Sequence, residues 1–578
     1  MAVNDMFIFK RVLVIALAYM VSACGESESP SPADYVFVNG KIFTSNAAEP
    51  YAEALAVRGA EILFVGSDDR ISGFIDDTTQ VVDIAGGLVM PGFMDSHTHI
   101  FMGSYTDVGV NLSLADTPEK LESALEAIRD DNPGGAPIYA RGWQNHLFSA
   151  QGPLAGQLDE VFGDRVVILQ SVDGHSTWFS SKALRDGGVT SVTPDPEPGV
   201  SFFERDPLTN EPLGTGREAA GSDILATLIP GDSAAYRDRL IQWLPRASAA
   251  GLTSVYDAWS AAPTELDSYE ILSALDVADA LPLRVFGSVR QLASAEEIAD
   301  RFELFQTRYS GKFVRPEAVK IGVDGVPEGH TAFLLTPYVD KTEEDFGHPM
   351  MSEEDLTQQI TTYFSRDIPV HLHAIGGAAV RMSLDAIEEA RRVTGNQTVR
   401  ATIAHMDFVS AEDIERFSTL NVTPQTSIQW AARDPSYFNI GSFVGMDKVE
   451  AAYPVRSLIE AGANQTFGAD WPASAYLSTF KPLQLIEAAV TRRLPGDSTM
   501  PQRNPEESLS IAEAIVAMTR NTAIQVGESE RLGTLEAGKQ ADIVLLDRDI
   551  FAVEPHTIGS TSVRMTMVAG EIVYQSVD

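Results

Sequence analysis

The middle of this chain alternates short apolar segments with helical patterns, and this alternation narrows the folds that it can adopt. Residues 294–309 and 411–420 have the spacing of amphipathic helices, and Ser410 is placed to cap the second one. Apolar segments with strand character occur at residues 165–169, 318–321, 368–373 and 402–405. Such alternation over several hundred residues predicts a parallel sheet covered by helices. We therefore expect an α/β fold, for which a closed (β/α)8 TIM-like barrel is the favoured form.

Both ends of the chain differ from the middle because they are rich in short strands. An apolar run near the start is broken by Asn39–Gly40, a sequence typical of tight hairpins. The same pattern returns near the end, where Ala569–Gly570 divides two strand-like runs. We expect residues 35–90 and 531–578 to form one small β-sandwich domain built from both chain ends.

The remaining region, residues 91–530, has room for a complete barrel, which typically needs about 250 residues. Within it, the stretch from about residue 143 to 230 carries many Gly, Pro and Asp residues. We expect this stretch to be an insertion that follows the first barrel strand and covers the mouth of the barrel.

The first residues have the features of an export signal. Two basic residues precede the apolar run at residues 12–21, and small residues then lead to Cys24. This order is typical of a secretory signal, and the run is too short to span a bilayer comfortably. The position of Cys24 resembles the lipobox of bacterial lipoproteins. By that resemblance, residues 1–23 would be removed, Cys24 would be lipidated and residues 24–34 would form a flexible tether. The alternative is an ordinary signal peptide with an incidental cysteine.

The resemblance to lipoproteins implies export to the bacterial cell envelope, with a lipid anchor on the periplasmic side. Acidic residues outnumber basic ones by 81 to 42, which gives a formal net charge of -39. A surface of that sign repels nucleic acid and anionic lipid, so we expect no nucleic-acid partner and no membrane contact beyond the anchor. The charge is explained by a solvated surface or by attraction of cationic substrates.

Cys24 is the single cysteine, which excludes a disulfide within the chain and a thiolate metal cluster. A metal ion would therefore need histidine, carboxylate or modified lysine ligands. His97 and His99 are separated by one residue at the end of a strand-like segment. Side chains at i and i+2 of a strand point to the same face, which at this end of a barrel strand looks into the mouth. Two neighbouring imidazoles suit a borderline metal such as zinc.

An isolated pair of this kind often arises by chance, but its surroundings favour a metal site. Pro91, Gly92 and Asp95 precede the histidines, and the whole segment resembles the first-strand signature of the amidohydrolase superfamily. Further strings occur in the same order as in amidohydrolase family 3, which includes N-substituted formamide deformylase and exoenzyme-regulator-like hydrolases. The resemblance runs from Val36 to about Tyr574, with marks at Arg141–Trp143, Asp173–Ser176, Val319–Gly325, His373–Gly376, Ala404–His405, Gly468–Pro472 and Gly538–Asp542.

The resemblance implies a cluster of two divalent metal ions, with zinc the most suitable element. One ion would be held by His97, His99 and Asp470, and the second by His373 and His405. Lys320 would bridge them as a carboxylated lysine, because carbamylation converts a cation into an anionic oxygen ligand. The alternative for Lys320 is an ordinary ion-paired lysine.

The strand that contains His373 carries a second histidine, His371, on the same face. The Ala-Ile-Gly that follows His373 favours it as the ligand, so we expect His371 to be a hydrogen-bonded residue inside the strand. The family pattern usually continues with Gly-Asp, whereas this chain has Gly376–Gly377. The missing carboxylate puts in doubt a local capping or supporting interaction.

The implied activity is hydrolysis of a C–N bond, in an amide, formamide or carbamate-like small molecule, by metal-activated hydroxide. Asp470 would take the proton of the water and deliver it to the leaving nitrogen; the alternative is a helix-capping aspartate. His175 would bind substrate or its oxyanion, or else hold the insertion together. Trp143 would form part of the pocket wall and Asp324 would support the groups that bind metal, or else both would contact substrate directly.

Two other classes of function remain open at this point. The same fold supports deamination or ester hydrolysis, although deaminases of the superfamily generally lack the bridging lysine. A non-catalytic, lipid-anchored binding or regulatory protein would not need all six ligand positions. Barrels of this kind often pair, so a homodimer is compatible with the sequence.

Overall fold

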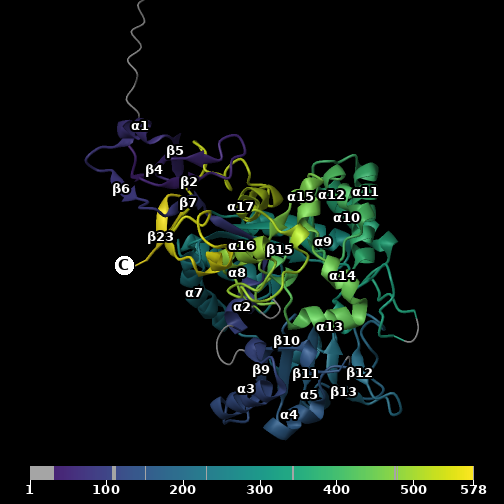
Figure 1. Cartoon of the computed structure of the whole chain (residues 1–578). Coiled ribbons are helices and arrows are strands. Elements are labelled where there is room, and N and C mark those ends of the chain that lie inside the picture. Colours follow the sequence, from purple (N-terminus) through teal and green to yellow (C-terminus); the bar gives the residue numbers. More distant parts are fainter. Residues whose placement is uncertain are drawn as a thin grey trace, which may run out of the picture.

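The computed structural model describes residues 32–576 apart from 107–111, 150, 230, 342–343, 474–476 and 478. The signal peptide, Cys24 and most of the expected tether lie outside these residues. Figure 1 shows an α/β body with a small β-domain at one end and a separate β-rich lobe at the other. Among the described residues, no helix has the length and apolar character required to cross a membrane.

The body is built around an eight-stranded sheet in which all neighbouring strands are parallel. In spatial order its strands are β8 (Phe93–Thr98), β14 (Leu252–Asp257), β15 (Arg284–Arg290), β16 (Val314–Gly322), β17 (Val370–Ala374), β18 (Ala401–His405), β19 (Val422–Thr426) and β20 (Thr466–Phe467). Backbone hydrogen bonds from Asp470 N to His97 O and from His99 N to Trp471 O join the segment after β20 to β8. The expected TIM-like barrel is confirmed.

Helices follow the barrel strands and cover the sheet on its outer side (Figure 1). Local sequence explains their starts: Ser294 accepts a hydrogen bond from Glu297 N and forms a capping box at α9 (Ala295–Tyr309). Ser410 accepts one from Glu412 N at α12 (Ala411–Thr419), as its position predicts. Other helices around the barrel are α7 (Ser233–Ala249), α8 (Glu265–Val277), α10 (Glu353–Ser365), α11 (Gly377–Thr394) and α16 (Pro482–Thr491).

The two chain ends meet in one β-sandwich, as expected. A four-stranded sheet contains β1 (Tyr35–Val38), β4 (Ala54–Arg58), β5 (Glu61–Gly66) and β6 (Gln80–Asp83). A six-stranded sheet contains β2 (Lys41–Phe43), β3 (Tyr51–Ala52), β7 (Leu88–Pro91), β21 (Ile543–Leu546), β22 (Val563–Val568) and β23 (Glu571–Gln575). β7 and β21 pair antiparallel, and Phe37, Val89 and Ile543 from both sheets share a buried core. Ala33 is also buried, so ordered packing begins before Tyr35.

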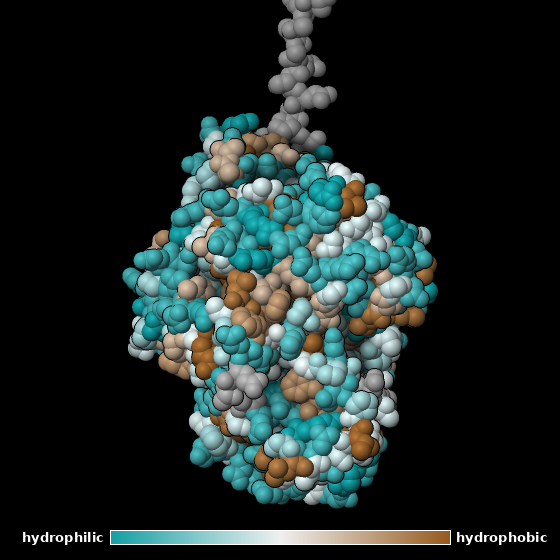
Figure 2. Space-filling model, turned by 90° about the vertical axis from the view of Figure 1, so that its right-hand side faces the viewer, coloured by the Kyte–Doolittle hydropathy of each residue, from teal (hydrophilic) through white to brown (hydrophobic). Residues whose placement is uncertain are grey.

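A five-stranded sheet occupies the segment between β8 and β14, and we call residues 112–229 the insert. Its strands are β9 (Ile138–Trp143), β10 (Val167–Ser171), β11 (Ser176–Phe179), β12 (Phe203–Arg205) and β13 (Pro212–Arg217). Helix α3 (Pro118–Asp131) packs into the same core as β9, ahead of the boundary near residue 143 suggested by composition. The insert forms the lower lobe in Figures 1 and 2, and the visible surface is largely hydrophilic with scattered apolar side chains.

A buried ion pair joins the barrel to the β-sandwich. Arg284, the first residue of β15, donates to Asp542, the residue before β21, and their side chains are 6% and 7% exposed. Asp542 also accepts a hydrogen bond of 2.8 Å from Ala569 N, next to the final hairpin turn. The carboxylate therefore links the last strands of the chain to the third barrel strand.

We expect Asp542→Ala to lower the free energy of unfolding by about 3–5 kcal/mol, because it leaves the buried Arg284 guanidinium without a counter-ion. Urea unfolding followed by circular dichroism measures the effect. Lys312→Ala is the control, since it removes the cation of an exposed ion pair with Asp279, which contributes little to stability. Equal destabilisation by the two variants would contradict the role given to Asp542.

Candidate metal centre

The six residues expected to hold metal all lie at or near the carboxyl ends of barrel strands. His97 and His99 come from the end of β8, and Lys320 from β16. His373 lies on β17 and His405 ends β18, while Asp470 follows β20. All strands of the barrel are parallel, so these ends meet at one rim. The insert contributes His175 to the same place, with its ring 5.2 Å from that of His373.

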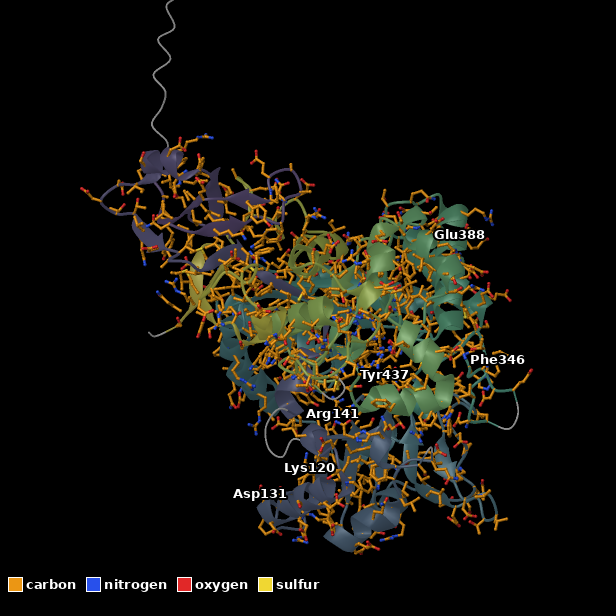
Figure 3. The ribbon with its side chains drawn as sticks, in the orientation of Figure 1. Lys120, Asp131, Arg141, Phe346, Glu388 and Tyr437 are labelled. Atoms are coloured by element: carbon orange, nitrogen blue, oxygen red, sulfur yellow. The ribbon has the colours of Figure 1, made fainter. Side chains whose placement is uncertain are left out.

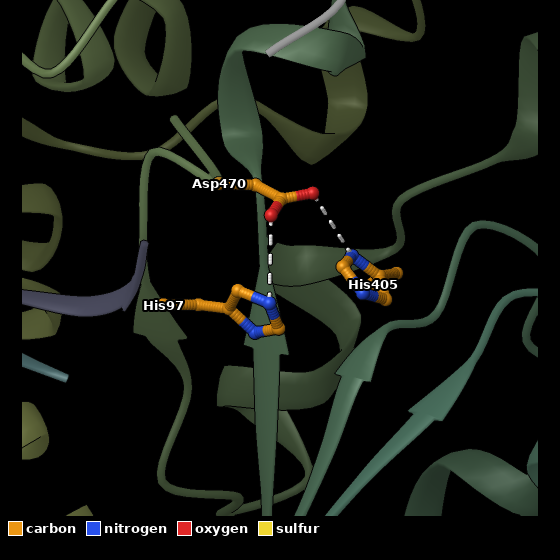
Figure 4. A group of neighbouring side chains, drawn as sticks. All are labelled: His97, His405 and Asp470. Carbon is orange, nitrogen blue, oxygen red and sulfur yellow. Dashed lines mark ion pairs between the residues drawn. The ribbon is translucent and has the colours of Figure 1, made fainter. Parts of the chain in front are cut away.

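Asp470 lies between His97 and His405 (Figure 4), and its carboxylate also contacts His99. Its Oδ1 is 2.8 Å from His99 Nε2 and 3.5 Å from His97 Nε2, and its Oδ2 is 3.8 Å from His405 Nδ1. The backbone at Asp470 has a φ of 49°, in the left-handed region that non-glycine residues rarely adopt. Its amide donates to His97 O, 2.7 Å away, which fixes the carboxylate relative to β8.

The chemistry of this group fits a metal ion. One ligand atom from each of His97, His405 and Asp470 lies within 4.8 Å of the others. His97 Nε2, His405 Nδ1 and Asp470 Oδ1 are buried without a hydrogen-bond partner in the described part of the chain, although His99 Nε2 lies within ion-pair distance of Asp470 Oδ1. Burial holds the pKa of both imidazoles well below its ordinary value, so they are neutral, the form that binds metal. A divalent cation would satisfy all three orphaned atoms.

His373 extends the group on the side of His405. The two rings are 4.4 Å apart, and burial lowers the pKa of His373 well below its ordinary value. Trp430 stacks on the ring of His405, with 5.5 Å between ring centres and an angle of 14°. His405 is thus in contact with both an imidazole and an indole.

His371 supports the group from below. Its Nε2 is 2.9 Å from His97 Nδ1, and its ring stacks on Tyr256 at 4.6 Å. This contact uses Nδ1 of His97 and leaves Nε2 to face Asp470. The expectation that His371 is a hydrogen-bonded residue within its strand is confirmed, and its partner is a candidate ligand.

Lys320 lies inside the barrel with 4% of its surface exposed, and its Nζ has no hydrogen-bond partner among the described residues. Burial lowers the pKa of Lys320 to about 7, although the Asp470 carboxylate opposes this effect. An unpaired ammonium at such a position is costly. Conversion to a carbamate would give the side chain an anionic oxygen at the rim where the histidines meet.

Glu218 orients His175, a role that no motif in the sequence indicates. His175 Nδ1 is 2.7 Å from Glu218 Oε2, and Glu218 Oε1 accepts a hydrogen bond of 2.6 Å from Thr331 Oγ1. Burial alone would lower the pKa of His175, but the carboxylates of Glu218, Asp173 and Asp470 together outweigh it and raise the pKa to about 9. Glu218 follows the last strand of the insert, so only the folded chain brings it to the histidine.

Trp143 and Asp324 are both enclosed by the protein, and each is held by hydrogen bonds to the backbone. Trp143 is fully buried in the core of the insert, and its indole N–H donates to Leu169 O at 3.0 Å. Asp324 is also fully buried, and its carboxylate accepts three backbone N–H groups, from Phe333, Ile375 and Gly376. Two of these amides follow His373, so Asp324 holds the loop beside the histidine. Neither side chain faces an open surface.

A cavity of about 50 Å³ lies beside the candidate metal centre. Its lining includes Ile375, Asp407 and Ala473, which follow His373, His405 and Asp470 along the chain, and also Trp430. The lining is rich in carboxylates, at Asp173, Glu328, Asp407 and Asp434. Burial raises the pKa of Glu328 to about 8 and that of Asp407 to about 7. His146 also lines this cavity, and nothing in the sequence singled it out.

The matches with known proteins extend over nearly the whole chain. The chain is 28% identical over 550 residues to Protein LONG AFTER FAR-RED 3 of Arabidopsis thaliana, covering 94% of this chain and 92% of that protein. It is 26% identical over 565 residues to N-substituted formamide deformylase of Arthrobacter pascens, covering 94% and 98%. An uncharacterized metal-dependent hydrolase from Pyrococcus horikoshii has the same fold, with a TM-score of 0.69 at 22% identity, covering 90% and 99%.

The family model described as the amidohydrolase family matches residues 80–574. This span contains every barrel strand, the insert and the last three strands of the β-sandwich. It also contains the histidines, Lys320 and Asp470 at the barrel rim. The chain belongs to the amidohydrolase family.

Proposed function

We propose that this chain is a metal-dependent hydrolase that cleaves the C–N bond of an amide, formamide or carbamate-like small molecule. The observation that carries the proposal is the set of buried, unpartnered atoms of His97, His405, Asp470 and Lys320 at one rim of the barrel. Support comes from the similarity to N-substituted formamide deformylase, which covers 98% of that protein.

Two metal ions would have suitable ligands in this arrangement. His97, His99 and Asp470 would hold the first, and His373 and His405 the second, with carboxylated Lys320 between them. Imidazole and carboxylate ligands of this kind suit zinc. When bound, such ions lower the pKa of a water molecule and polarise a carbonyl oxygen.

The side chains of this protein supply the remaining steps. Asp470 accepts a proton from the attacking water as its oxygen forms a bond to the carbonyl carbon, and it then delivers this proton to the nitrogen as the C–N bond breaks. The products are a carboxylic acid and an amine. His175, oriented by Glu218 at 2.7 Å, donates a hydrogen bond to the carbonyl oxygen as negative charge develops on it. The indole of Trp430 forms an apolar wall of the cavity beside His405.

We expect His97→Ala to lose bound metal and hydrolytic activity together. Removing a partner that only orients a ligand typically costs roughly 10- to 100-fold in activity, so removing the ligand itself should cost more. Metal content is measured by elemental analysis, and hydrolysis with a panel of N-formyl and N-acyl amines. His348→Ala, at an exposed histidine, should retain both properties. A His97→Ala protein with normal metal and turnover would rule out this site.

The panel also separates the proposed reaction from the other classes. Release of ammonia from aminated heterocycles without amide cleavage would identify a deaminase, and turnover of esters alone an esterase. A protein that binds metal but hydrolyses none of these compounds would support a binding or regulatory role.

Lys320→Ala should lower the metal content by about one ion per chain and reduce turnover, because the anionic bridge is lost. Growth with ¹³C-labelled bicarbonate followed by ¹³C NMR should detect a carbamate carbon in the parent protein. That signal should be absent from Lys320→Ala and still present in Lys312→Ala, which changes an exposed lysine. A parent protein without the signal would contradict carboxylation of Lys320.

We also propose that Cys24 carries a lipid that anchors the protein in the cell envelope. Only the apolar run and the cysteine after it support this proposal. The full-length protein expressed in a bacterium should partition into the detergent phase of a Triton X-114 extract, and Cys24→Ser should move it to the aqueous phase. Equal partitioning of the two would contradict lipidation.

A further inference from the structure

Arg141 is a buried arginine whose charge has no partner. It lies on β9, and the whole residue is 8% exposed. Both of its terminal nitrogens, Nη1 and Nη2, are buried without a hydrogen-bond partner among the described residues. No carboxylate of the described chain lies within ion-pair distance of the guanidinium. Such a group is costly to bury alone, so its retention requires an explanation.

The guanidinium lies close to the candidate metal centre. It packs against Gly174, where a Cβ atom would come within 3.0 Å of Nη2. Gly174 is followed by His175, whose ring is 5.2 Å from that of His373. Burial lowers the pKa of Arg141, while the carboxylates of Asp173 and Asp470 act in the opposite direction. Figure 3 shows Arg141 at the level where the insert meets the barrel.

The two carboxylates that act electrostatically on Arg141, those of Asp173 and Asp470, have other contacts. Asp173 accepts hydrogen bonds from Asn145 Nδ2, from Ser171 Oγ and from His175 N. It therefore shapes the loop that carries His175. Asp470 belongs to the metal group. The carboxylates of Asp173 and Asp470 thus create a negative potential around Arg141. Among the described residues, however, no group accepts a hydrogen bond from its Nη1 or Nη2.

A second arginine of the insert shows what a structural role looks like. Arg205, on the opposite edge strand β12, donates to the carbonyl oxygens of Thr190, Thr193 and Asn210. Its guanidinium also lies 3.6 Å from the carboxylate of Asp195. Arg205 therefore connects loops of the insert to one another. The terminal nitrogens of Arg141 make no such hydrogen bond to the described residues.

We propose that Arg141 binds a carboxylate group of the substrate, so that the enzyme acts on amides that carry a carboxylate near the scissile C–N bond. This inference rests on the proposed function, because it places the substrate at the same metal centre. A guanidinium presents a planar pair of N–H donors that matches the two oxygens of a carboxylate. A single guanidinium balances one negative charge, so a monoanion fits better than a phosphate dianion beside Asp173 and Asp470.

Matched substrate pairs test the proposal. N-formylphenylalanine and N-formylphenethylamine differ only in the carboxylate, as do N-formylleucine and N-formyl-3-methylbutylamine. The parent enzyme should prefer the carboxylate member of a pair in kcat/KM. Arg141→Met should reduce that preference by at least about 30-fold, the fold-change expected when one partner of a desolvated charge pair is removed. Arg141→Lys should reduce it less, since the charge remains.

Arg205→Met is the matched control at the other edge of the same sheet. It should lower the melting temperature, because it removes three hydrogen bonds, and it should leave the substrate preference unchanged. Arg141→Met should not lower the melting temperature, since it removes an unpaired buried charge. An unchanged preference in Arg141→Met, including an equal loss for both members of each pair, would overturn the proposal.

A binding experiment decides the proposal even if no compound of the panel is hydrolysed. Isothermal titration of the metal-loaded protein with 3-phenylpropionate should show binding at least about 30-fold tighter to the parent than to Arg141→Met. Titration with 3-phenylpropionamide should show no such difference. Equal affinity of both proteins for the carboxylate would overturn the inference, whereas absent hydrolysis with the expected titration would count against the proposed reaction alone.

Discussion

The backbone hydrogen bond from Asp470 N to His97 O, 2.7 Å long, is the contact on which the candidate centre depends. It joins the first and last segments of the barrel and at the same time sets the Asp470 carboxylate between His97, His99 and His405. The closed barrel holds Asp470 in this unfavourable backbone conformation, because the hydrogen bond to His97 O fixes the chain at that point. Closure of the sheet and assembly of the ligand group are therefore one structural event.

Partners from other elements hold the remaining groups in place. His371 contacts His97 from within the barrel, and Glu218 contacts His175 from the insert. Asp324 holds the amides that follow His373. These interactions leave the metal-facing atoms free while they restrict each ring to one orientation, which is how ligand geometry is maintained before an ion or substrate arrives.

Sequence reasoning worked where one strand or one repeating pattern carries the information. The alternation of strands and helices predicts the barrel, and the spacing of His97 and His99 follows from the period of a β-strand. It could not decide the place of Trp143, whose indole packs inside the insert, because a conspicuous aromatic residue looks the same in a pocket and in a core. Glu218 and His146 gain their meaning only from the way the insert lies against the barrel. Such contacts have no fixed spacing along the chain.

The composite β-sandwich has a consequence for the order in which the chain can fold. β7 near the start pairs with β21 near the end, and Val89 shares a core with Ile543 and Met567. During synthesis, the first strands must therefore wait until almost the entire polypeptide has left the ribosome. Until then, β7 keeps one edge without its final partner, and such an edge promotes association with other chains. The barrel lies between these two sets of strands in the sequence and can collapse earlier. Pairing of the last strands with β7 then completes the β-sandwich.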